Sequence, residues 1–281
     1  MGFLTRRTLM TATLLAAMPA GKLCAAIPRH KGLDLSNATD RHAAIVKMRG
    51  TFGTEMLMGY VAGRYYGYSE GRMTPLYGLL AGTFTQHRLL ANGDVQGVTF
   101  ELAYFTDWDT GELLERWKNP YTHRTVDVPR FRTEPGRFTI SREGRIVTET
   151  VPAGGTHVDL FLEPVVVGND VWITEANQTQ VPTADPARPF FYNELVTMHA
   201  LQSDLDNASL KSVPTAMNFQ SEVSWRPWQQ MGDTPGHLVG NAAGQKLTRI
   251  DDFPERYIPW SRKYHPDVFV DLPAFLNKGW S

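Results

Sequence analysis

The chain has 281 residues, of which 42% are hydrophobic, and its 28 basic and 29 acidic side chains leave a formal charge of −1. This length and apolar content suffice to bury a sizeable core, in one large domain or two modest ones. The even charge balance argues against a nucleic-acid partner, which would require a basic face.

Residues 1–26 carry the features of a cleavable export signal. Arg6 and Arg7 precede a weakly apolar run from Leu9 to Ala20, and Cys24-Ala25-Ala26 supplies a small-x-small ending. The paired arginines predict the bacterial twin-arginine route, an address that the translocation machinery reads and not a membrane anchor. An ordinary secretory signal with two adjacent arginines is the alternative.

Cleavage after Ala26 would leave residues 27–281 as a single β-rich domain. Arg6, Arg7 and Lys22 leave and no acid leaves, so the formal charge falls from −1 to −4. The only cysteine leaves as well, which excludes disulfides and thiolate catalysis in the mature chain. No apolar run of the mature chain is long enough to span a bilayer. We therefore expect a soluble protein in the periplasm or outside the cell.

One helix and many strands are predicted in the mature chain. The helix is expected over Ser36–Met48, with Ser36, Asn37 or Thr39 as its N-cap. Val98–Tyr104 alternates apolar residues with polar or small ones, which is typical of a strand with one buried face. The strand candidates are Thr54–Val61, Thr83–Leu90, Val98–Tyr104, Leu113–Lys118, Arg137–Ser141, Arg145–Val151, Val158–Val167, Val171–Asn177, Glu194–Leu201, Met217–Trp225 and Lys246–Ile250.

Turn signals separate these strands at short intervals. Asn92-Gly93, Glu143-Gly144 and Gly168-Asn169-Asp170 each predict a hairpin. Many short strands joined by hairpins indicate a mainly β protein, an antiparallel meander that closes into a lipocalin-like barrel or forms a sandwich, with few short helices. The Pro-rich stretch Val181–Pro189 is expected to be a loop within one domain. The tail from Asp251, with four prolines, is expected to wrap the surface.

The segment Tyr104–Thr122 concentrates acidic, basic and aromatic side chains between two turn signals. Thr106–Gly111 is predicted as a turn, in which the glycine supplies a positive φ and Asp107 or Asp109 hydrogen-bonds the backbone. The alternative is that these acids act as general acid and base, or as ligands. A calcium loop is excluded, because the glycine position of such a loop holds Glu112 and the bidentate glutamate position holds Lys118.

The return strand Glu112–Lys118 has no cleanly apolar face. Arg116 shares one face with Glu112, and Trp117 shares the other with Glu115. Polar side chains of this strand therefore face either an interior cavity or solvent on both sides.

Two stretches resemble one family. Thr106-Asp107-x-x-Thr110-Gly111-Glu112 with Trp117-x-Asn119-Pro120-Tyr121-Thr122, and the later run Ser224–Gly232, are similar to domain-of-unknown-function family 1838, found in bacteria and fungi. The likeness covers the chain from about Arg41 to the C-terminus. The chain has His123-Arg124 where the family pattern has Gly-Glu, which bears on the geometry of this second turn. The resemblance implies no known activity and no catalytic residues.

Other side chains with potential chemistry give weaker signals. Trp225-Arg226-Pro227-Trp228 either lines a pocket or forms an aromatic corner that closes the barrel, with Arg226 stacked on a ring. The histidines show no metal-ligand spacing, so no metal site is predicted; His199 lies in a strand candidate and is the first to test. No nucleotide-binding or nucleophile-elbow motif is present, and no cofactor is implied.

Three functions remain open. The leading hypothesis is an exported protein that holds a small, largely apolar molecule inside a β-barrel. The second is a cofactor-independent acid–base enzyme on the same scaffold, a lyase, isomerase or hydrolase, whose candidate residues would converge on one pocket. The third is an interaction module of the cell envelope with a large exposed apolar patch. The candidate catalytic residues are Asp107, Asp109, Glu112 and His199, and the candidate ligand-binding residues are Arg116, Trp117, Trp225, Arg226 and Trp228.

Overall fold

A computed structural model describes residues 32–149, 154–185 and 188–281. The predicted export signal and Cys24 lie outside these ranges. Within them, no helix combines the length and apolar character needed to cross a bilayer.

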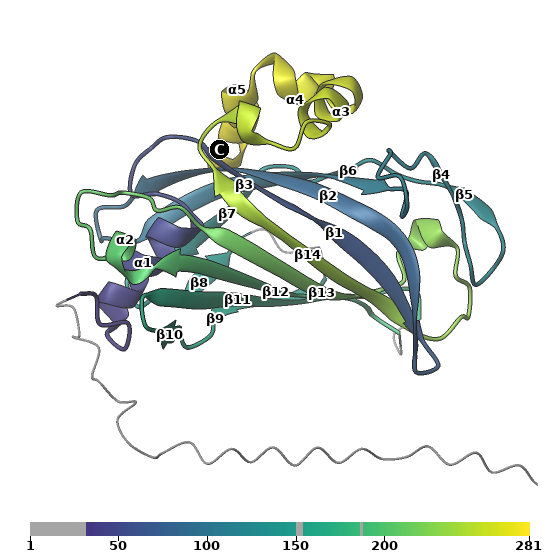
Figure 1. Cartoon of the computed structure of the whole chain (residues 1–281), viewed down its shortest axis with the longest axis horizontal. Coiled ribbons are helices and arrows are strands. Elements are labelled where there is room, and N and C mark those ends of the chain that lie inside the picture. The colour runs from purple at the N-terminus through teal and green to yellow at the C-terminus, as the bar shows by residue number, and fades with distance from the viewer. Residues whose placement is uncertain (1–31, 150–153, 186–187) are drawn as a thin grey trace, which may run out of the picture. The chain divides into compact units, whose positions relative to one another are not determined.

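The fold is an antiparallel sheet that is nearly closed into a barrel, as the sequence predicts (Figure 1). Strands pair in the order β10-β11-β12-β13-β14-β1-β2-β3-β7-β8, with β9 added to β11 and β6 added to β3. A separate two-stranded sheet joins β4 to β5. The strands are β1 (Leu57–Ser69), β2 (Arg72–Leu89), β3 (Val95–Thr106), β4 (Arg116–Lys118), β5 (Thr125–Asp127), β6 (Phe131–Arg132), β7 (Gly136–Ile140), β8 (Ile146–Thr148), β9 (Thr156–Phe161), β10 (Val165–Val167), β11 (Asp170–Val181), β12 (Phe190–Leu201), β13 (Ala216–Ser224) and β14 (His237–Leu247).

The helices are few and short, apart from the predicted N-terminal one. That helix is α1 (Ala38–Arg49), and the Asn37 side chain caps it by accepting from the Thr39 amide at 2.8 Å. The other helical segments are α2 (Gln202–Leu205), η1 (Pro227–Gln229), η2 (Ile250–Asp252), α3 (Tyr257–Tyr264), α4 (Pro266–Val270), α5 (Leu272–Asn277) and η3 (Lys278–Trp280).

The three predicted hairpin turns are confirmed. Gly93, Gly144 and Gly168 join β2 to β3, β7 to β8 and β10 to β11, each with a positive φ. Only glycine adopts this conformation without a steric cost, so these positions fix where the strands end.

Several strand predictions are wrong in their bounds: the strand expected over Val158–Val167 is divided between β9 and β10, and Thr83–Leu90 is only the end of β2. The strand expected over Lys246–Ile250 is the end of β14, which begins at His237, and residues 250–252 form η2 instead. The rest of β14 could not be predicted, because its glycines break the apolar alternation. Glycine is needed at position 240, since a Cβ there would lie 2.8 Å from the Tyr65 ring. The return strand Leu113–Lys118 shrinks to β4, with Leu113 making an isolated bridge to Thr106.

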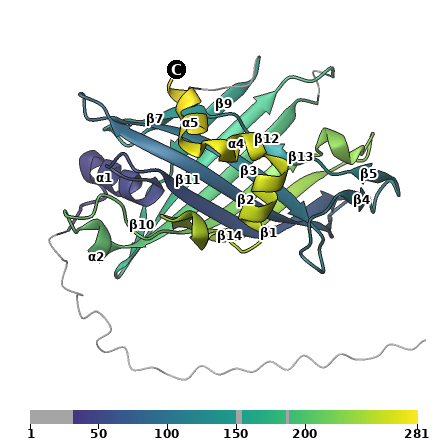
Figure 2. The same ribbon diagram turned by 90° about the horizontal axis from the view of Figure 1, so that it is seen from above.

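The C-terminal helices cover one outer face of the barrel. In Figure 2, α3, α4 and α5 lie across β2 and β3. The apolar residues of the predicted Val98–Tyr104 alternation face these helices, and Phe100 meets Phe275 edge to face with ring centroids 5.0 Å apart. The Tyr257 hydroxyl reaches the Gly82 and Leu102 carbonyls, both at 3.1 Å. The polar residues of this strand consequently face the barrel interior and not solvent.

Different structures close the two ends of the barrel. Helix α1 lies at one end, where Lys246 Nζ donates to the Lys47 and Gly50 carbonyls that end the helix. The β4–β5 hairpin and η1 lie at the other end (Figure 1). Here Trp117, Trp228 and Tyr77 form an aromatic cluster with ring centroids 5.4 to 5.7 Å apart.

Candidate functional site

A cavity of about 320 Å³ lies inside the barrel. Alternate residues of β1, β2, β3, β11, β12 and β13 line it, as the pleat of a strand dictates. Most are small or apolar, but two arginines and three glutamates also face it: Arg49, Arg226, Glu101, Glu175 and Glu194. A volume of this size lies at the lower end of the range for small-molecule sites.

Arg49 enters the cavity from the last turn of α1 and is paired. Its Nε donates to Glu175 Oε2 at 2.7 Å and its Nη2 to Oε1 at 3.0 Å, which is a bidentate ion pair. The guanidinium also lies 4.1 Å above the Phe138 ring. The Glu175 side chain is 9% exposed, so this end of the cavity is electrically neutralised.

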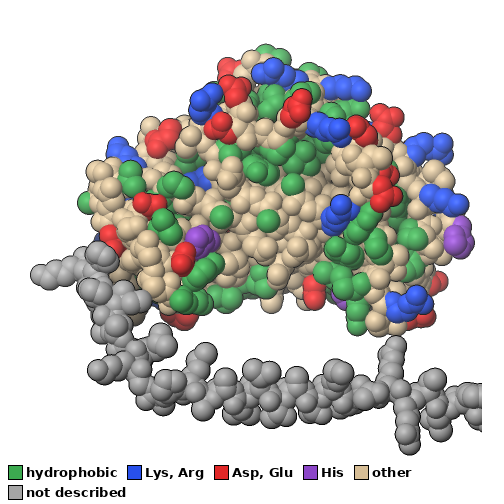
Figure 3. Space-filling view, viewed as in Figure 1, with side chains coloured by type: hydrophobic (Ala, Val, Ile, Leu, Met, Phe, Trp, Pro, Cys, Tyr) green, Lys and Arg blue, Asp and Glu red, His purple; other side chains and the backbone are tan. Residues whose placement is uncertain are grey.

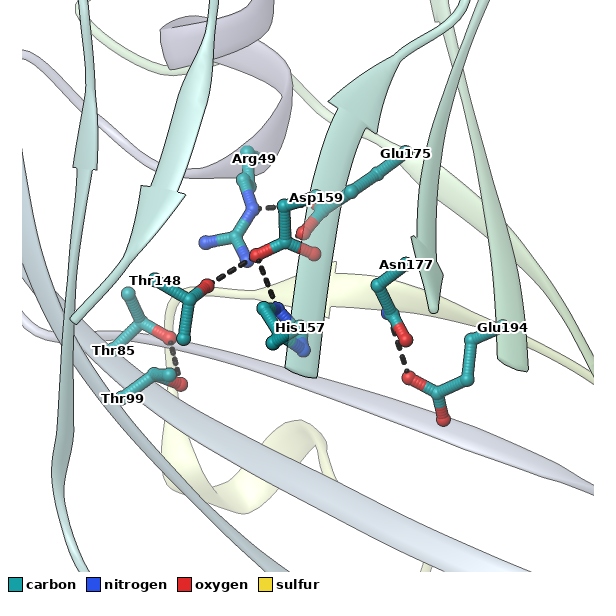
Figure 4. A network of polar contacts seen from close by, with 9 residues as sticks. All are labelled: Arg49, Thr85, Thr99, Thr148, His157, Asp159, Glu175, Asn177 and Glu194. Carbon is teal, nitrogen blue, oxygen red and sulfur yellow. Dashed lines mark hydrogen bonds and ion pairs between the residues drawn. The ribbon is translucent and has the colours of Figure 1, made fainter. Parts of the chain in front are cut away.

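A second polar network closes the seam between β8 and β9 next to this pair (Figure 4). The Thr148 hydroxyl donates to Asp159, whose Oδ2 lies 2.9 Å from His157 Nε2. The other His157 nitrogen lies 2.7 Å from the Thr179 hydroxyl. All of these side chains have partners, and the network joins strands that lack a continuous backbone ladder.

Arg226 enters the cavity from the opposite end, at the start of η1. Its guanidinium interacts with the Tyr65 hydroxyl, which helps to raise the pKa of Arg226, but its Nε is buried without a hydrogen-bond partner among the described residues. None of their carboxylates lies within the 4.0 Å of an ion pair. Four aromatic rings surround its central carbon at 5.7 to 5.9 Å, those of Tyr65, Phe105, Phe131 and Tyr192.

Glu194 is held in place from two sides. The Tyr192 hydroxyl donates to Oε1, and Asn177 Nδ2 donates to Oε2 at 3.0 Å (the Asn177 contact is drawn in Figure 4). Burial raises the pKa of Glu194, although these two hydrogen bonds act in the opposite direction. Burial also raises the pKa of Tyr192 well above its usual range, which keeps its hydroxyl a donor.

Glu101 differs from the other two glutamates because its carboxylate has no hydrogen-bond or ion-pair partner among the residues that the structure describes. It points inward from β3, where its nearest neighbour on β2 is Thr83. Burial raises the pKa of Glu101 to about 7; the charge of Glu194 adds to this shift and that of Arg226 opposes it.

The two stretches that resemble the family meet behind Arg226. Asn119 is fully buried, and its Nδ2 donates to the Gln229 carbonyl at 2.8 Å. Gln229 is also fully buried, accepts from the Arg226 amide at 2.8 Å and donates to the Tyr77 hydroxyl at 3.1 Å. The two motifs thus build the wall that positions Arg226.

The four candidate catalytic residues do not converge. Asp107 forms the predicted turn, accepting from the Thr110 amide and hydroxyl at 2.8 and 2.9 Å, and these hydrogen bonds lower its pKa. Asp109 is exposed, and Glu112 pairs with Arg256 on the surface at 2.8 Å. His199 lies on β12 with its Nε2 2.7 Å from Asp170 and its ring beside Trp172. None of these four lines the cavity.

Of the five candidate ligand-binding residues, Arg226 alone lines the cavity. Arg116 is exposed beside Asp127. Trp117 and Trp228 belong to the aromatic cluster at the barrel end, and the Trp225 indole donates to the Thr234 carbonyl at 3.0 Å. The tryptophans of the Trp-Arg-Pro-Trp run thus form an aromatic corner, and its arginine lines the pocket.

The sequence contains one signal for the cavity residues, the polar positions of two predicted strands. Thr99 and Glu101 are the polar positions of the predicted Val98–Tyr104 alternation, and Glu194 begins the predicted Glu194–Leu201 strand. A polar stripe on a strand is usually solvent-facing. Here the apolar stripe of β3 faces the C-terminal helices, so the polar stripe faces inward.

Two other kinds of site can be compared with the cavity. No group of three or more His, Cys, Asp or Glu in the described ranges is arranged to hold a metal ion. A hollow of about 620 Å³ lies on the outer face of β11–β14 and β1. Its lining combines amides such as Gln178 with the carboxylates of Glu194 and Glu222. Figure 3 shows few charged side chains in the middle of this view. This hollow lies on the outside of the sheet, whereas the cavity described above lies inside the barrel.

The fold and the cavity define a class: an antiparallel β-barrel, closed differently at its two ends, whose interior contains acidic side chains and an arginine that forms no ion pair with the described residues. A family model described as "Protein of unknown function (DUF1838)" matches residues 69–268. The chain belongs to this family, as its two motifs predict. A comparison with curated proteins finds no match.

Proposed function

We propose that the barrel binds a small organic anion, an apolar or aromatic body carrying a carboxylate, with Arg226 as the anchor for the charge. The observation that carries this proposal is the Arg226 guanidinium, which faces an interior cavity without a carboxylate partner among the described residues.

A buried charge without a partner is costly, because it loses its hydration and gains little in return. A bound carboxylate would replace that hydration with charge-assisted, bidentate hydrogen bonds, for which the guanidinium fork is suited. The rings around Arg226 offer a surface for the rest of the ligand, and the small and apolar residues farther in, such as Ala81 and Val61, leave room for it.

The test is calorimetric titration with 2-naphthoate and its neutral isostere 2-naphthamide. We expect the protein to prefer the carboxylate by roughly 10- to 100-fold, since a hydrogen bond to a charged group contributes about 1.5–3 kcal/mol. Arg226→Met should abolish that preference and leave amide binding in place. The matched control is Arg116→Met, which changes an exposed arginine paired with Asp127. This variant should keep the wild-type preference for the carboxylate. Equal affinity of the wild-type protein for the two compounds would refute the proposal.

We also infer that the protein acts after twin-arginine export to the periplasm or beyond. Arg6 and Arg7 ahead of a weakly apolar run support this location. Fractionation of cells that express the full chain should recover it outside the cytoplasm. Arg6→Lys/Arg7→Lys, or loss of the translocase, should retain it inside. Export that continues in cells without the translocase would assign the signal to the general secretory route instead.

A further inference from the structure

We propose that Glu101 is a general base that removes a proton from the molecule held at Arg226, so that the cavity carries out proton transfer as well as binding. The inference rests on the proposed function for its natural substrate, an organic acid with an acidic C–H bond. Its test uses a neutral probe, so the two can fail separately.

The position of Glu101 is rigid, but its carboxylate is free. The Glu101 amide donates to the Thr133 hydroxyl at 2.8 Å, and the Thr133 amide donates to the Glu101 carbonyl at 3.0 Å. Phe100 and Leu102, on either side along the strand, are packed beneath the C-terminal helices. The backbone therefore cannot tilt the side chain out of the cavity, while no hydrogen bond within the described residues occupies the carboxylate oxygens.

The protonation of Glu101 suits a base that works near neutral pH. The charged groups that act on the pKa of Glu101 are Glu194 on β12 and Arg226, which immediately precedes η1; its neighbour on β2 is the uncharged Thr83. Burial keeps the Glu101 pKa near 7, so at this pH both the basic and the acidic form are present. A base is most effective when its pKa lies close to the working pH.

Glu194 has a different role because its oxygens are already used. The Tyr192 hydroxyl and the Asn177 amide both donate to it. It is a positioning residue: its negative charge raises the pKa of Glu101.

The chemistry balances without a cofactor. Glu101 takes the proton from carbon, and the C–H electron pair moves into an enolate or expels a leaving group. The guanidinium of Arg226 stabilises the negative charge that develops on oxygen. The protonated Glu101 then returns its proton to another atom of the same molecule, which gives an isomerisation, or to solvent, which gives an elimination.

The test is ring opening of 5-nitrobenzisoxazole, a neutral compound in which loss of the C3 proton breaks the N–O bond and forms a coloured cyanophenolate. We expect the wild-type protein to accelerate this reaction, and Glu101→Gln to lower the rate by roughly 10²-fold or more, the usual contribution of a positioned base. Glu112→Gln, which alters a surface carboxylate, is the matched control and should match the wild type. Circular dichroism of each variant verifies that it is folded, and Glu101→Asp, which keeps the carboxylate, should retain part of the activity.

The pH profile separates a base from a structural residue. The wild-type rate should rise with a midpoint near pH 7, and Glu194→Gln should move that midpoint to lower pH by removing the neighbouring charge. A rate that is the same in the wild type and folded Glu101→Gln overturns the inference, whatever the naphthoate titration shows. Glu101-dependent turnover together with equal binding of naphthoate and naphthamide would keep the base and reject the anion site.

Discussion

The barrel cavity has an arginine at each end, and the two are in opposite situations. Arg49 comes from the last turn of α1 and has both a carboxylate and an aromatic ring as partners. Arg226 immediately precedes η1 and lies among aromatic rings, but has no carboxylate at ion-pair distance among the described residues. The same residue type is thus neutralised at one end and left available at the other.

The hydrogen bonds of the cavity glutamates explain why Arg49 has a carboxylate partner and Arg226 does not. Glu175 could serve only Arg49, because its two oxygens already accept from that guanidinium. Glu194 is held by Tyr192 and Asn177, and so does not form an ion pair with Arg226. The Arg49–Glu175 ion pair is therefore expected to stabilise the barrel, whereas Arg226 is expected to contribute little to stability, and unfolding measurements can separate the two.

The largest expected effect is that of Arg49→Met on stability. Removing the guanidinium leaves Glu175 charged and without its partner, which typically costs about 3–5 kcal/mol. Urea unfolding monitored by tryptophan fluorescence gives the free energy. The double variant Arg49→Met/Glu175→Gln is the control and should regain most of the loss, because it removes the unpaired charge. A single variant as stable as the double one would show that the pair contributes little.

The next largest effect is that of Glu101→Gln on the pH dependence of the free energy of unfolding. The pKa of Glu101 is about 7 in the folded protein against 4.5 as its ordinary value, so between these values the folded state binds more protons than the unfolded state. Wild-type stability should therefore fall as pH rises from 4.5 to 7 and then level off. Relative to the wild type, Glu101→Gln should gain up to roughly 3 kcal/mol at pH 8, because each tenfold difference in proton affinity between the two states corresponds to about 1.4 kcal/mol.

Urea unfolding of both proteins at pH 5 and pH 8 makes the measurement, with Glu112→Gln as a surface control. A difference between wild type and Glu101→Gln that is the same at both pH values would mean that Glu101 is solvated and not held in a low-dielectric cavity.

Arg226→Met should change stability much less than Arg49→Met. No carboxylate of the described residues loses an ion pair, and replacing a buried charge with an apolar side chain of similar volume is often neutral or stabilising. We expect a change within about 1 kcal/mol, or a gain, in the same urea experiment. A loss as large as that of Arg49→Met would show that Arg226 maintains the fold and would remove the contrast between the two ends.

The sequence predicted the barrel well and its interior poorly, and the reason is physical. Hairpin turns and strand alternation are local, so Asn92-Gly93 and Val98–Tyr104 could be assigned from neighbouring residues. The direction in which Glu101 points depends on what covers the other face of β3, and that cover comes from helices more than 150 residues later in the chain. No local pattern contains that information.

Arg226 was identified from sequence because the tryptophans around it mark an unusual segment. The concentration of charged side chains in one stretch likewise made candidates of Asp107, Asp109 and Glu112. Their partners are close neighbours in the turn or a surface arginine, whereas the cavity acids are dispersed over three strands. Clustering along the chain therefore indicated the family motif and not the cavity acids.

The smallest expected effect sets the baseline for the comparison. Glu112→Gln breaks the 2.8 Å pair with Arg256, in which the Glu112 and Arg256 side chains are 64% and 48% exposed. Water solvates both charges when they separate, so the pair should contribute no more than about 0.5 kcal/mol. Urea unfolding at low and high salt measures this, and the small difference should disappear at high salt because exposed charges are screened.

The Arg49–Glu175 pair is buried, so its contribution should persist under the same salt. Equal salt sensitivity of the two pairs would show that water reaches Arg49. The two ends of the cavity would then differ only in whether a carboxylate lies beside the arginine.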